Sequence, residues 1–412
     1  MKSFLPFRRL LALVALLSLS LGTGAILPLI AQSRRQPPVS NKKKNTRPAE
    51  GGQQPAEQQD PLPPDLVNKP GDAEKIEIKT ALVNVDAVVY QKKSKQVVNG
   101  LKRENFAVFE DGVKKEITNF STPEAPITVA LVVEFSKLGE QFGYAQTQGM
   151  EPGQAEVLRP MAMFLSQFMK PPQDYVTVIA YDMRPTPITD FTNDPRRIQE
   201  TISFMLRQTP AFRETNLFDA LKFTMIGGRG DAVAMEESKS DKGEYAGLAS
   251  VQGRRTAVIL ISSGIDTFSK INYGQARKIL QNAGVPVYII GTGNMYFKRY
   301  GDQLGALDSL LNDPGRLSML QAQNALTTFA KETGGAYYPV TFEGEVPSTL
   351  RSIDLMLRSQ YSLGYRPGDV RDGKQHKIVV KVDVDGDGQY DDKEYTVNAR
   401  QFYNAPKPDP VK

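Results

Sequence analysis

The chain of 412 residues has no cysteine, no tryptophan and a single histidine, His376. Without cysteine it can form no disulfide, no cysteine-containing zinc site and no thiol nucleophile. One histidine supplies no histidine-based metal cluster and argues against a Ser-His-Asp catalytic apparatus. These absences favour a protein that is not an enzyme, and they leave His376 as an ordinary strand or turn residue.

A strong charge of one sign is also missing. The chain has 51 basic and 46 acidic residues, which gives a net charge of +5 with the two signs mixed. This balance predicts no nucleic-acid surface and therefore no nucleic-acid partner. With 40% hydrophobic residues, the chain can bury at least one full-sized core. Without disulfides, the stability of an exported form depends on packing.

The amino-terminal segment predicts export. Residues 1–9 carry three basic side chains, and residues 10–31 have no charge and are rich in Leu and Ala. This pattern is typical of a signal peptide, which we favour, and an uncleaved membrane anchor is the alternative. We therefore expect a periplasmic or extracellular protein whose only membrane contact is residues 10–31. Residues 32–75 have no aromatic side chain and predict a disordered linker.

Four short apolar runs predict the central fold. The first, Ile127–Ser136 (ITVALVVEFS), is rich in β-branched residues and typical of a strand buried on both faces of a parallel sheet. Similar runs follow at Asp174–Tyr181, Thr256–Ser263 and Val285–Gly291, with enough chain between them for crossover helices. The sequence therefore predicts a doubly wound, mainly parallel α/β sheet. Ligands of such sheets bind at the carboxyl ends of the strands.

Shorter strand-like segments flank this domain. In front of it, Phe106–Phe109 and Ile117–Phe120 flank Asp111-Gly112 and predict a hairpin. Behind it, strand-like runs resume from Tyr361 onward. We therefore expect six parts: an export segment or anchor (1–31), a linker (32–75), a small β module (76–125), the α/β domain (126–345), a β-rich segment (346–405) and a tail (406–412).

Three segments, taken together, resemble the von Willebrand factor A-related (VWA) proteins of Acidobacteria, which are exported proteins with a VWA domain between β segments. They are Leu101–Gly112 (LKRENFAVFEDG), Thr215–Leu221 (TNLFDAL) and Tyr361–Pro367 (YSLGYRP). The resemblance covers roughly residues 76–403. It implies a fold similar to integrin I domains and a role in binding a partner.

VWA domains often bind a divalent cation at a metal-ion-dependent adhesion site, which keeps an open position for a carboxylate of the partner. The family pattern is Asp-x-Ser-x-Ser after the first strand, a Thr on a second loop and an Asp after a third strand. Carried over residue by residue, the resemblance places Glu134 at the first Asp, Ser136 at the first Ser, Leu138 at the second Ser, Thr215 at the Thr and Ser263 at the last Asp.

This chain departs from that pattern in three ways. Ser263 lacks the negative charge, Leu138 lacks an oxygen, and the extra methylene of Glu134 displaces its carboxylate by about one bond length, which Mg²⁺ tolerates poorly. Asp266, three residues beyond Ser263, is an alternative source of the missing negative charge, which we do not favour. We expect a degenerate site without Mg²⁺, with weak Mg²⁺ occupancy as the alternative. Its residues are Glu134, Ser136, Thr215, Ser263 and Asp266.

A second candidate metal site lies near the carboxyl terminus. Residues Asp383–Glu394 (DVDGDGQYDDKE) follow the spacing of an EF-hand calcium loop. The flanks look like strands, so we expect a structural Ca²⁺ that holds a β-hairpin, and a solvated acidic turn is the alternative. The loop positions 1, 3, 5, 6, 9 and 12 are Asp383, Asp385, Asp387, Gly388, Asp391 and Glu394.

Three functions remain open. The first, which we favour, is an exported interaction protein that presents the carboxyl edge of the sheet to a protein or envelope polysaccharide. The second is a purely structural envelope module, which a flat polar site edge beside an exposed apolar β patch would favour. The third is an envelope hydrolase that uses Glu134 and Asp266 as a carboxylate pair, and no other residue supports it.

Overall fold

The computed structural model describes residues 82–123, 125–142, 165, 168, 170, 172–208, 210–229, 244–251, 254–309, 313–367 and 372–405. The predicted export segment, linker and tail lie outside this part of the chain. Within it, no helix combines the length and apolar character that are needed to cross a bilayer.

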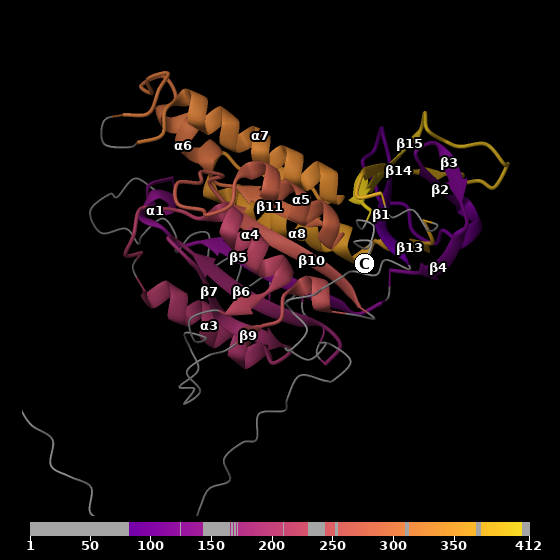
Figure 1. Ribbon diagram of the computed structural model, residues 1–412, viewed down its shortest axis with the longest axis horizontal. Helices are drawn as coiled ribbons and strands as arrows, with labels where there is room; N and C mark the ends of the chain where they lie inside the picture. The colour runs from indigo at the N-terminus through magenta and orange to yellow at the C-terminus, as the bar shows by residue number, and fades with distance from the viewer. Residues whose placement is uncertain are drawn as a thin grey trace, which may run out of the picture. The chain divides into compact units, whose positions relative to one another are not determined.

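The central sheet has six strands in the order β12-β11-β10-β5-β6-β7 (Figure 1). All neighbours are parallel except β7, which runs antiparallel to β6 at the edge. This arrangement confirms the predicted doubly wound, mainly parallel fold. The strands are β5 (Ile127–Glu134), β6 (Tyr175–Tyr181), β7 (Pro185–Thr192), β10 (Arg255–Ser262), β11 (Val287–Gly291) and β12 (Tyr337–Pro339).

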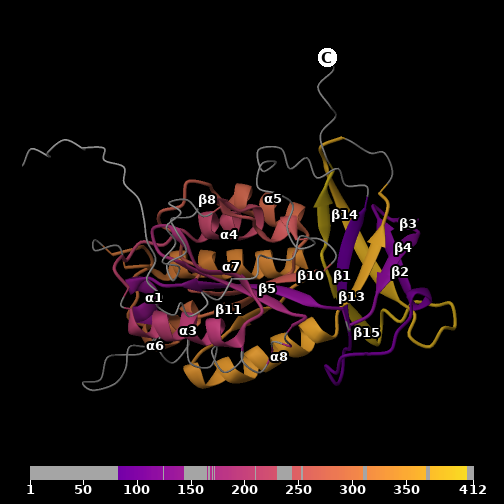
Figure 2. The same ribbon diagram turned by 90° about the horizontal axis from the view of Figure 1, so that it is seen from below.

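Helices cover both faces of this sheet (Figure 2). All eight residues of β5 are buried. Its alternate side chains enter two separate apolar cores, because neighbouring residues of a strand point to opposite faces. Apolar residues of α3 (Pro195–Arg207) and α8 (Val346–Arg358) line one core, and those of α4 (Leu217–Ile226), α5 (Tyr273–Ala283) and α7 (Arg316–Thr333) line the other.

The structure revises the boundary that we predicted after residue 345. Helix α8 buries Leu350, Ile353 and Leu357 in the same core as β5, so it belongs to the α/β domain and not to the carboxyl-terminal β segment. The amphipathic pattern of α8 indicates a helix, and only its packing assigns it to a domain.

The two flanking β segments form one β-sandwich. Each of its two four-stranded antiparallel sheets mixes strands from both segments, in the orders β15-β1-β13-β4 and β16-β14-β2-β3. The prediction of two separate modules, 76–125 and 346–405, is therefore wrong. The strands are β1 (Val83–Gln91), β2 (Phe106–Glu110), β3 (Val113–Lys115), β4 (Ile117–Ser121), β13 (Tyr361–Tyr365), β14 (Gln375–Val382), β15 (Tyr395–Ala399) and β16 (Phe402–Asn404).

The predicted hairpin is present, but its second strand differs from the prediction. Asp111 and Gly112 both adopt positive φ, at 49° and 84°, as a tight two-residue turn requires. The turn joins β2 to β3, whereas β4, which contains the predicted Ile117–Phe120, pairs with β13 in the other sheet. The switch of sheets after β3 closes one corner of the sandwich.

A buried arginine connects the sandwich to the α/β domain. The guanidinium of Arg255, the first residue of β10, donates to the carbonyls of Pro123, Ala125, Leu357 and Gln360. These carbonyls belong to the two connections between the domains, β4 to β5 and α8 to β13. The amino end of the parallel sheet is thereby held at the sandwich, and its carboxyl end forms the opposite edge.

Candidate functional site

Glu134, the last residue of β5, is buried within a set of hydrogen-bond donors. Its Oε2 accepts from the backbone N–H of Ser263 at 2.7 Å and from the Ser263 hydroxyl at 2.8 Å, and its Oε1 accepts from Ser136 at 3.0 Å. Ser262 and Tyr181 lie 3.3 and 3.4 Å from Oε2 and 2.8 Å from each other. We call these five residues the Glu134 network.

Burial governs the electrostatics of this network. It raises the pKa of Glu134, and the donors of Ser263, Ser136 and Ser262 offset only part of that rise. Burial, followed by the Glu134 carboxylate, raises the pKa of Tyr181 well above its usual value, so the tyrosine remains a neutral donor. The network is therefore an internal polar cluster whose acceptor already has its donors.

An apolar cluster lies beside the Glu134 network. Leu138 is 2% exposed and packs with Ile265, Met319 and Ala322. The Ser136 hydroxyl accepts from the backbone N–H of Gly139 at 2.8 Å, which holds the turn that carries Leu138. The second serine of the adhesion-site pattern is thus replaced by a side chain that belongs to a small core.

Two of the predicted site residues have their polar groups bonded elsewhere. The Thr215 hydroxyl donates to the carbonyl of Ile265 at 2.7 Å. The Asp266 carboxylate accepts from the Ser269 hydroxyl at 2.5 Å and from the backbone N–H of Phe218 at 3.2 Å, so it caps the start of α4. Burial raises the pKa of Asp266, and these donors partly offset the rise.

The structure thus brings Glu134, Ser136 and Ser263 into direct contact. It adds Tyr181 and Ser262, which the sequence reasoning did not include. Both are polar residues at the carboxyl ends of the two strands that flank β5, namely β6 and β10. That position was the signal that could have identified them.

These residues do not fit a magnesium site. Mg²⁺ needs near-ideal octahedral coordination by oxygens. Here the oxygens of Glu134 and Thr215 already take part in protein hydrogen bonds, and Leu138 contributes carbon where an oxygen is needed. Ser263 is neutral where the pattern has a carboxylate, so the oxygens present carry less negative charge than the pattern supplies.

Exposed apolar side chains surround this edge of the sheet. The loop with Phe212 bonds to the residue after Ser136, because the Lys137 N–H donates to the Phe212 carbonyl at 2.7 Å. The loop after β10 bonds to the same region through the Phe268 N–H and the Thr215 carbonyl, 2.9 Å apart. We define the apolar collar as five side chains that are 49–74% exposed: Phe212, Phe268, Leu307, Leu317 and Leu320.

The remaining collar residues lie on the segment that leads into α7. An Arg213–Asp313 ion pair joins this segment to the loop that carries Phe212. Leu317 and Leu320 are on the first turns of α7, and the neighbouring Met319 is buried against Leu138. Sequence reasoning missed the collar because isolated apolar residues in polar loops show no periodicity.

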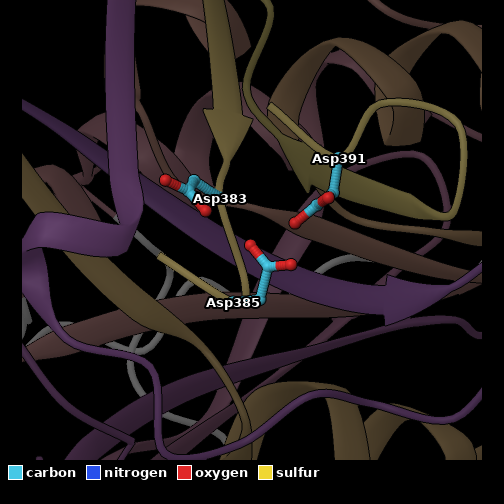
Figure 3. Close-up of side chains that lie close together, drawn as sticks. All are labelled: Asp383, Asp385 and Asp391. Atoms are coloured by element: carbon cyan, nitrogen blue, oxygen red, sulfur yellow. The ribbon is translucent and has the colours of Figure 1, made fainter. Parts of the chain in front are cut away.

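The acidic loop between β14 and β15 brings three carboxylates together (Figure 3). Oxygens of Asp383, Asp385 and Asp391 all lie within 4.8 Å of one another. Backbone N–H groups of the loop support them: Gly386 and Gly388 donate to the two oxygens of Asp383, and Val384 donates to Asp391. Carboxylate oxygens arranged in this way are typical ligands of Ca²⁺.

The other predicted ligands lie outside this group. The Asp387 carboxylate accepts from the backbone N–H of Gln389, and the Glu394 carboxylate is not among the grouped oxygens. Asp392 forms an ion pair with Lys381 at 2.6 Å. The loop runs between strands and not between helices, and of the EF-hand positions only 1, 3 and 9 supply the grouped carboxylates.

No family model matches the chain, and no curated protein matches it. Among solved structures, the PilB minor pilin of Streptococcus sanguinis is 14% identical, with a TM-score of 0.39, over 57% of this chain and 61% of the pilin. BatB of Bacteroides thetaiotaomicron is 13% identical (TM-score 0.34; 57% of this chain, 100% of BatB). The vWF domain of the type V pili tip protein Mfa5 of Porphyromonas gingivalis is also 13% identical (TM-score 0.34; 57% and 96%).

The match with the pilin spans about three fifths of that protein's length. At these identities and TM-scores, none of the three proteins is evidence for what this chain binds. The α/β fold rests on the strand order and register of the chain itself.

Proposed function

We propose that this is an exported, non-enzymatic interaction protein with a VWA-like α/β domain, and that it binds a protein partner through the apolar collar without a bridging cation. One observation carries the proposal: the carboxyl edge of the sheet combines a satisfied polar network with exposed apolar side chains. Export rests on the charge pattern of residues 1–31 and the VWA assignment on the three quoted motifs.

The collar supports a protein partner over a polysaccharide. Its leucines and phenylalanines offer apolar area and no hydrogen-bond groups, whereas sugars present many hydroxyls that need partners. Burying exposed apolar surface is the main driving force of most protein association. With Glu134 bonded internally, a carboxylate of the partner has no cation to coordinate, so we propose that apolar contact replaces the cation bridge.

The two rival functions have weaker support. A hydrolase that uses these two carboxyl groups needs both of them to face one substrate, but Glu134 is buried in its network and Asp266 caps α4. A purely structural module predicts a flat polar edge and an apolar patch on the sandwich. The sandwich does expose Val113, Val379 and Tyr390, but the carboxyl edge of the sheet also exposes apolar side chains and is not purely polar.

The test compares two matched surface variants of the whole protein. The collar variant is Leu317→Ser/Leu320→Ser, and the control is Val113→Ser/Val379→Ser on the sandwich. Each protein is immobilised and exposed to an envelope extract of the source organism, with and without EDTA. We expect the collar variant alone to lose bound protein, by at least about tenfold, and EDTA to have no effect.

Other results would overturn this proposal. Loss of binding in EDTA would restore a cation-bridged mechanism. Loss only in the sandwich variant would favour the structural module. If the protein binds a carbohydrate and the collar variant binds it equally well, the collar is not the binding site.

We also propose that the acidic loop binds one structural Ca²⁺ through Asp383, Asp385 and Asp391. The proposal is supported by the three mutually close carboxylates, which repel one another unless a cation neutralises them. Titration of the full chain with Ca²⁺ and with Mg²⁺ by calorimetry tests it. We expect Ca²⁺ binding with a stoichiometry of one and weaker Mg²⁺ binding, because the loop is open and irregular. No heat with either ion would favour the solvated acidic turn.

A further inference from the structure

The only histidine of the chain lies between two carboxylates. His376 is in β14, and its Nδ1 is 2.7 Å from Oδ2 of Asp111, in the turn between β2 and β3. Its Nε2 is 3.2 Å from Oδ1 of Asp372, which precedes β14. The imidazole ring stacks on Tyr403 of β16, with ring centroids 5.1 Å apart. Three separate segments therefore meet at one side chain.

Both ring nitrogens need a hydrogen to make these contacts. An ionised carboxylate is only an acceptor, and a neutral imidazole carries one N–H, so it can donate to only one of the two aspartates. The doubly protonated imidazolium donates to both. We infer that His376 is a pH-sensitive latch: when protonated, it holds the edge strand β16, the β2–β3 turn and residue Asp372 together on β14.

The edge position of β16 gives this latch its effect. β16 is the last strand of its sheet and pairs with β14 over only three residues, among them His376 with Tyr403. A short edge strand has few hydrogen bonds of its own and opens easily. The stacked ring of His376 is one of the contacts that hold it, beside the bond from Arg400 to the Phe402 carbonyl and those from Asn404 to Gln281 and Asn282.

The charges around His376 favour its protonated form. Burial lowers the pKa of His376, but the hydrogen bonds and charges of Asp111 and Asp372 outweigh burial, and the net pKa is raised above the usual 6.5. The backbone N–H of Lys377, followed by the side chain of His376, lowers the pKa of Asp111. The backbone N–H of Lys374 and the side chain of His376 lower the pKa of Asp372 in the same way.

The other titratable groups nearby add no competing base. Burial, followed by the Glu110 carboxylate on β2, raises the pKa of Tyr403, so its hydroxyl is neutral throughout the range in which His376 titrates. Lys374 is a cation and not a base that competes for the proton, and its charge lowers the pKa of Asp372.

The direction of the pH effect follows from these shifts. Because the pKa of His376 is higher in the folded than in the unfolded protein, its stabilisation is fully present below pH 6.5 and is lost as the pH rises through the folded value. The latch is therefore closed below the folded pKa of His376 and opens above it.

A single histidine allows a direct test by NMR. In the full protein labelled with ¹³C-histidine, one Cε1–H signal reports His376 without any assignment. We expect a titration midpoint above 6.5, lowered by Asp111→Asn and by Asp372→Asn. A midpoint at or below 6.5 would overturn the proposal.

Hydrogen exchange tests the latch itself. We expect the protection of residues 402–404, corrected for intrinsic exchange rates, to fall by roughly tenfold for each unit by which the pKa is raised, as the pH passes the midpoint. His376→Gln should show the low protection at every pH. Protection that does not change across the midpoint would mean that the ion pairs are static contacts and that His376 is no latch.

Discussion

Glu134 and the three grouped aspartates of the acidic loop offer the same kind of ligand atom, a carboxylate oxygen, but different groups surround their oxygens. Glu134 ends a buried strand, and its two oxygens accept from Ser136, just after β5, and from Ser263, just after β10. Asp383, Asp385 and Asp391 lie in an exposed or half-buried loop, where their oxygens face one another. Among the described residues, no ion pair reaches these three, and the nearby Lys381 pairs with Asp392 instead.

The difference shows what decides between a polar cluster and a metal site. Both groups match a metal-binding pattern in part, and the pattern records only which acceptors are present. The density of negative charge separates them: Glu134 is a single carboxylate among neutral donors, whereas the carboxylates of Asp383, Asp385 and Asp391 lie within 4.8 Å of one another and repel unless a cation neutralises them. The donors near Glu134 come from strands that are far apart in the sequence.

The largest expected effect is that of Glu134→Ala. The substitution leaves the donors of Ser263 and Ser262 without their acceptor and opens a cavity, so we expect a loss of about 3–4 kcal/mol in the free energy of unfolding. Urea unfolding followed by circular dichroism measures it. Glu134→Gln, which keeps the shape and one acceptor, is the control and should cost much less. Equal and small losses in both variants would mean that the network is not a structural unit.

The next effect is that of Leu138→Ser, which restores the hydroxyl of the adhesion-site pattern. We expect a loss of about 2–3 kcal/mol, because the substitution removes a buried side chain from the cluster with Ile265 and Met319. We also expect no gain in Mg²⁺ binding, since Glu134 keeps its internal donors. Thermal unfolding with and without Mg²⁺ measures both. A rise in melting temperature with Mg²⁺ in this variant alone would show that one hydroxyl suffices to rebuild the site.

Binding of Ca²⁺ to the acidic loop should stabilise the folded protein by a similar amount, which depends on the Ca²⁺ concentration. A ligand at 100 times its dissociation constant stabilises the folded state by about 2.7 kcal/mol. We expect Ca²⁺ to do so in the natural protein and in Asp392→Asn, because Asp392 is already paired with Lys381. Asp385→Asn should abolish the effect. Thermal unfolding in Ca²⁺ and in EDTA measures it, and equal behaviour of the two variants would argue against a site at the three aspartates.

The smallest effect is the pH dependence that Glu134 contributes. Because burial raises its pKa above the ordinary value of 4.5, the folded protein holds this proton to higher pH than the unfolded chain does. Stability from this group should therefore fall as the pH rises above 4.5, by up to about 1.4 kcal/mol for each unit of raised pKa. Unfolding curves between pH 4 and 8 measure it. Glu134→Gln should remove this slope, and an unchanged slope would assign it to another group.

The sequence predicts the strands and helices of the α/β domain closely. It does not predict which strands of the flanking β segments pair with one another. The run Ile127–Ser136 predicts β5 because a strand buried on both faces must be almost wholly apolar. Helix α5 (Tyr273–Ala283) is one of the expected crossover helices, and Asn272 and Gln275 form a capping box at its start. By contrast, the interleaving of β1 to β4 with β13 to β16 has no local signal, because strand pairing over some 250 residues depends on the whole chain.

The candidate sites divide in the same way. The sequence alone placed many acidic residues in one loop between two strand-like runs, but it did not decide which of them group, because Asp387 and Glu394 lie outside the three that do. It also determined that position 138 carries no oxygen and position 263 no charge. Only the tertiary structure decided that Tyr181 and Ser262 donate toward Glu134, that Asp266 caps a helix instead, and that an apolar collar surrounds the edge. The physical reason is that hydrogen bonds and burial depend on which strands become neighbours, and distant parts of the chain decide that together.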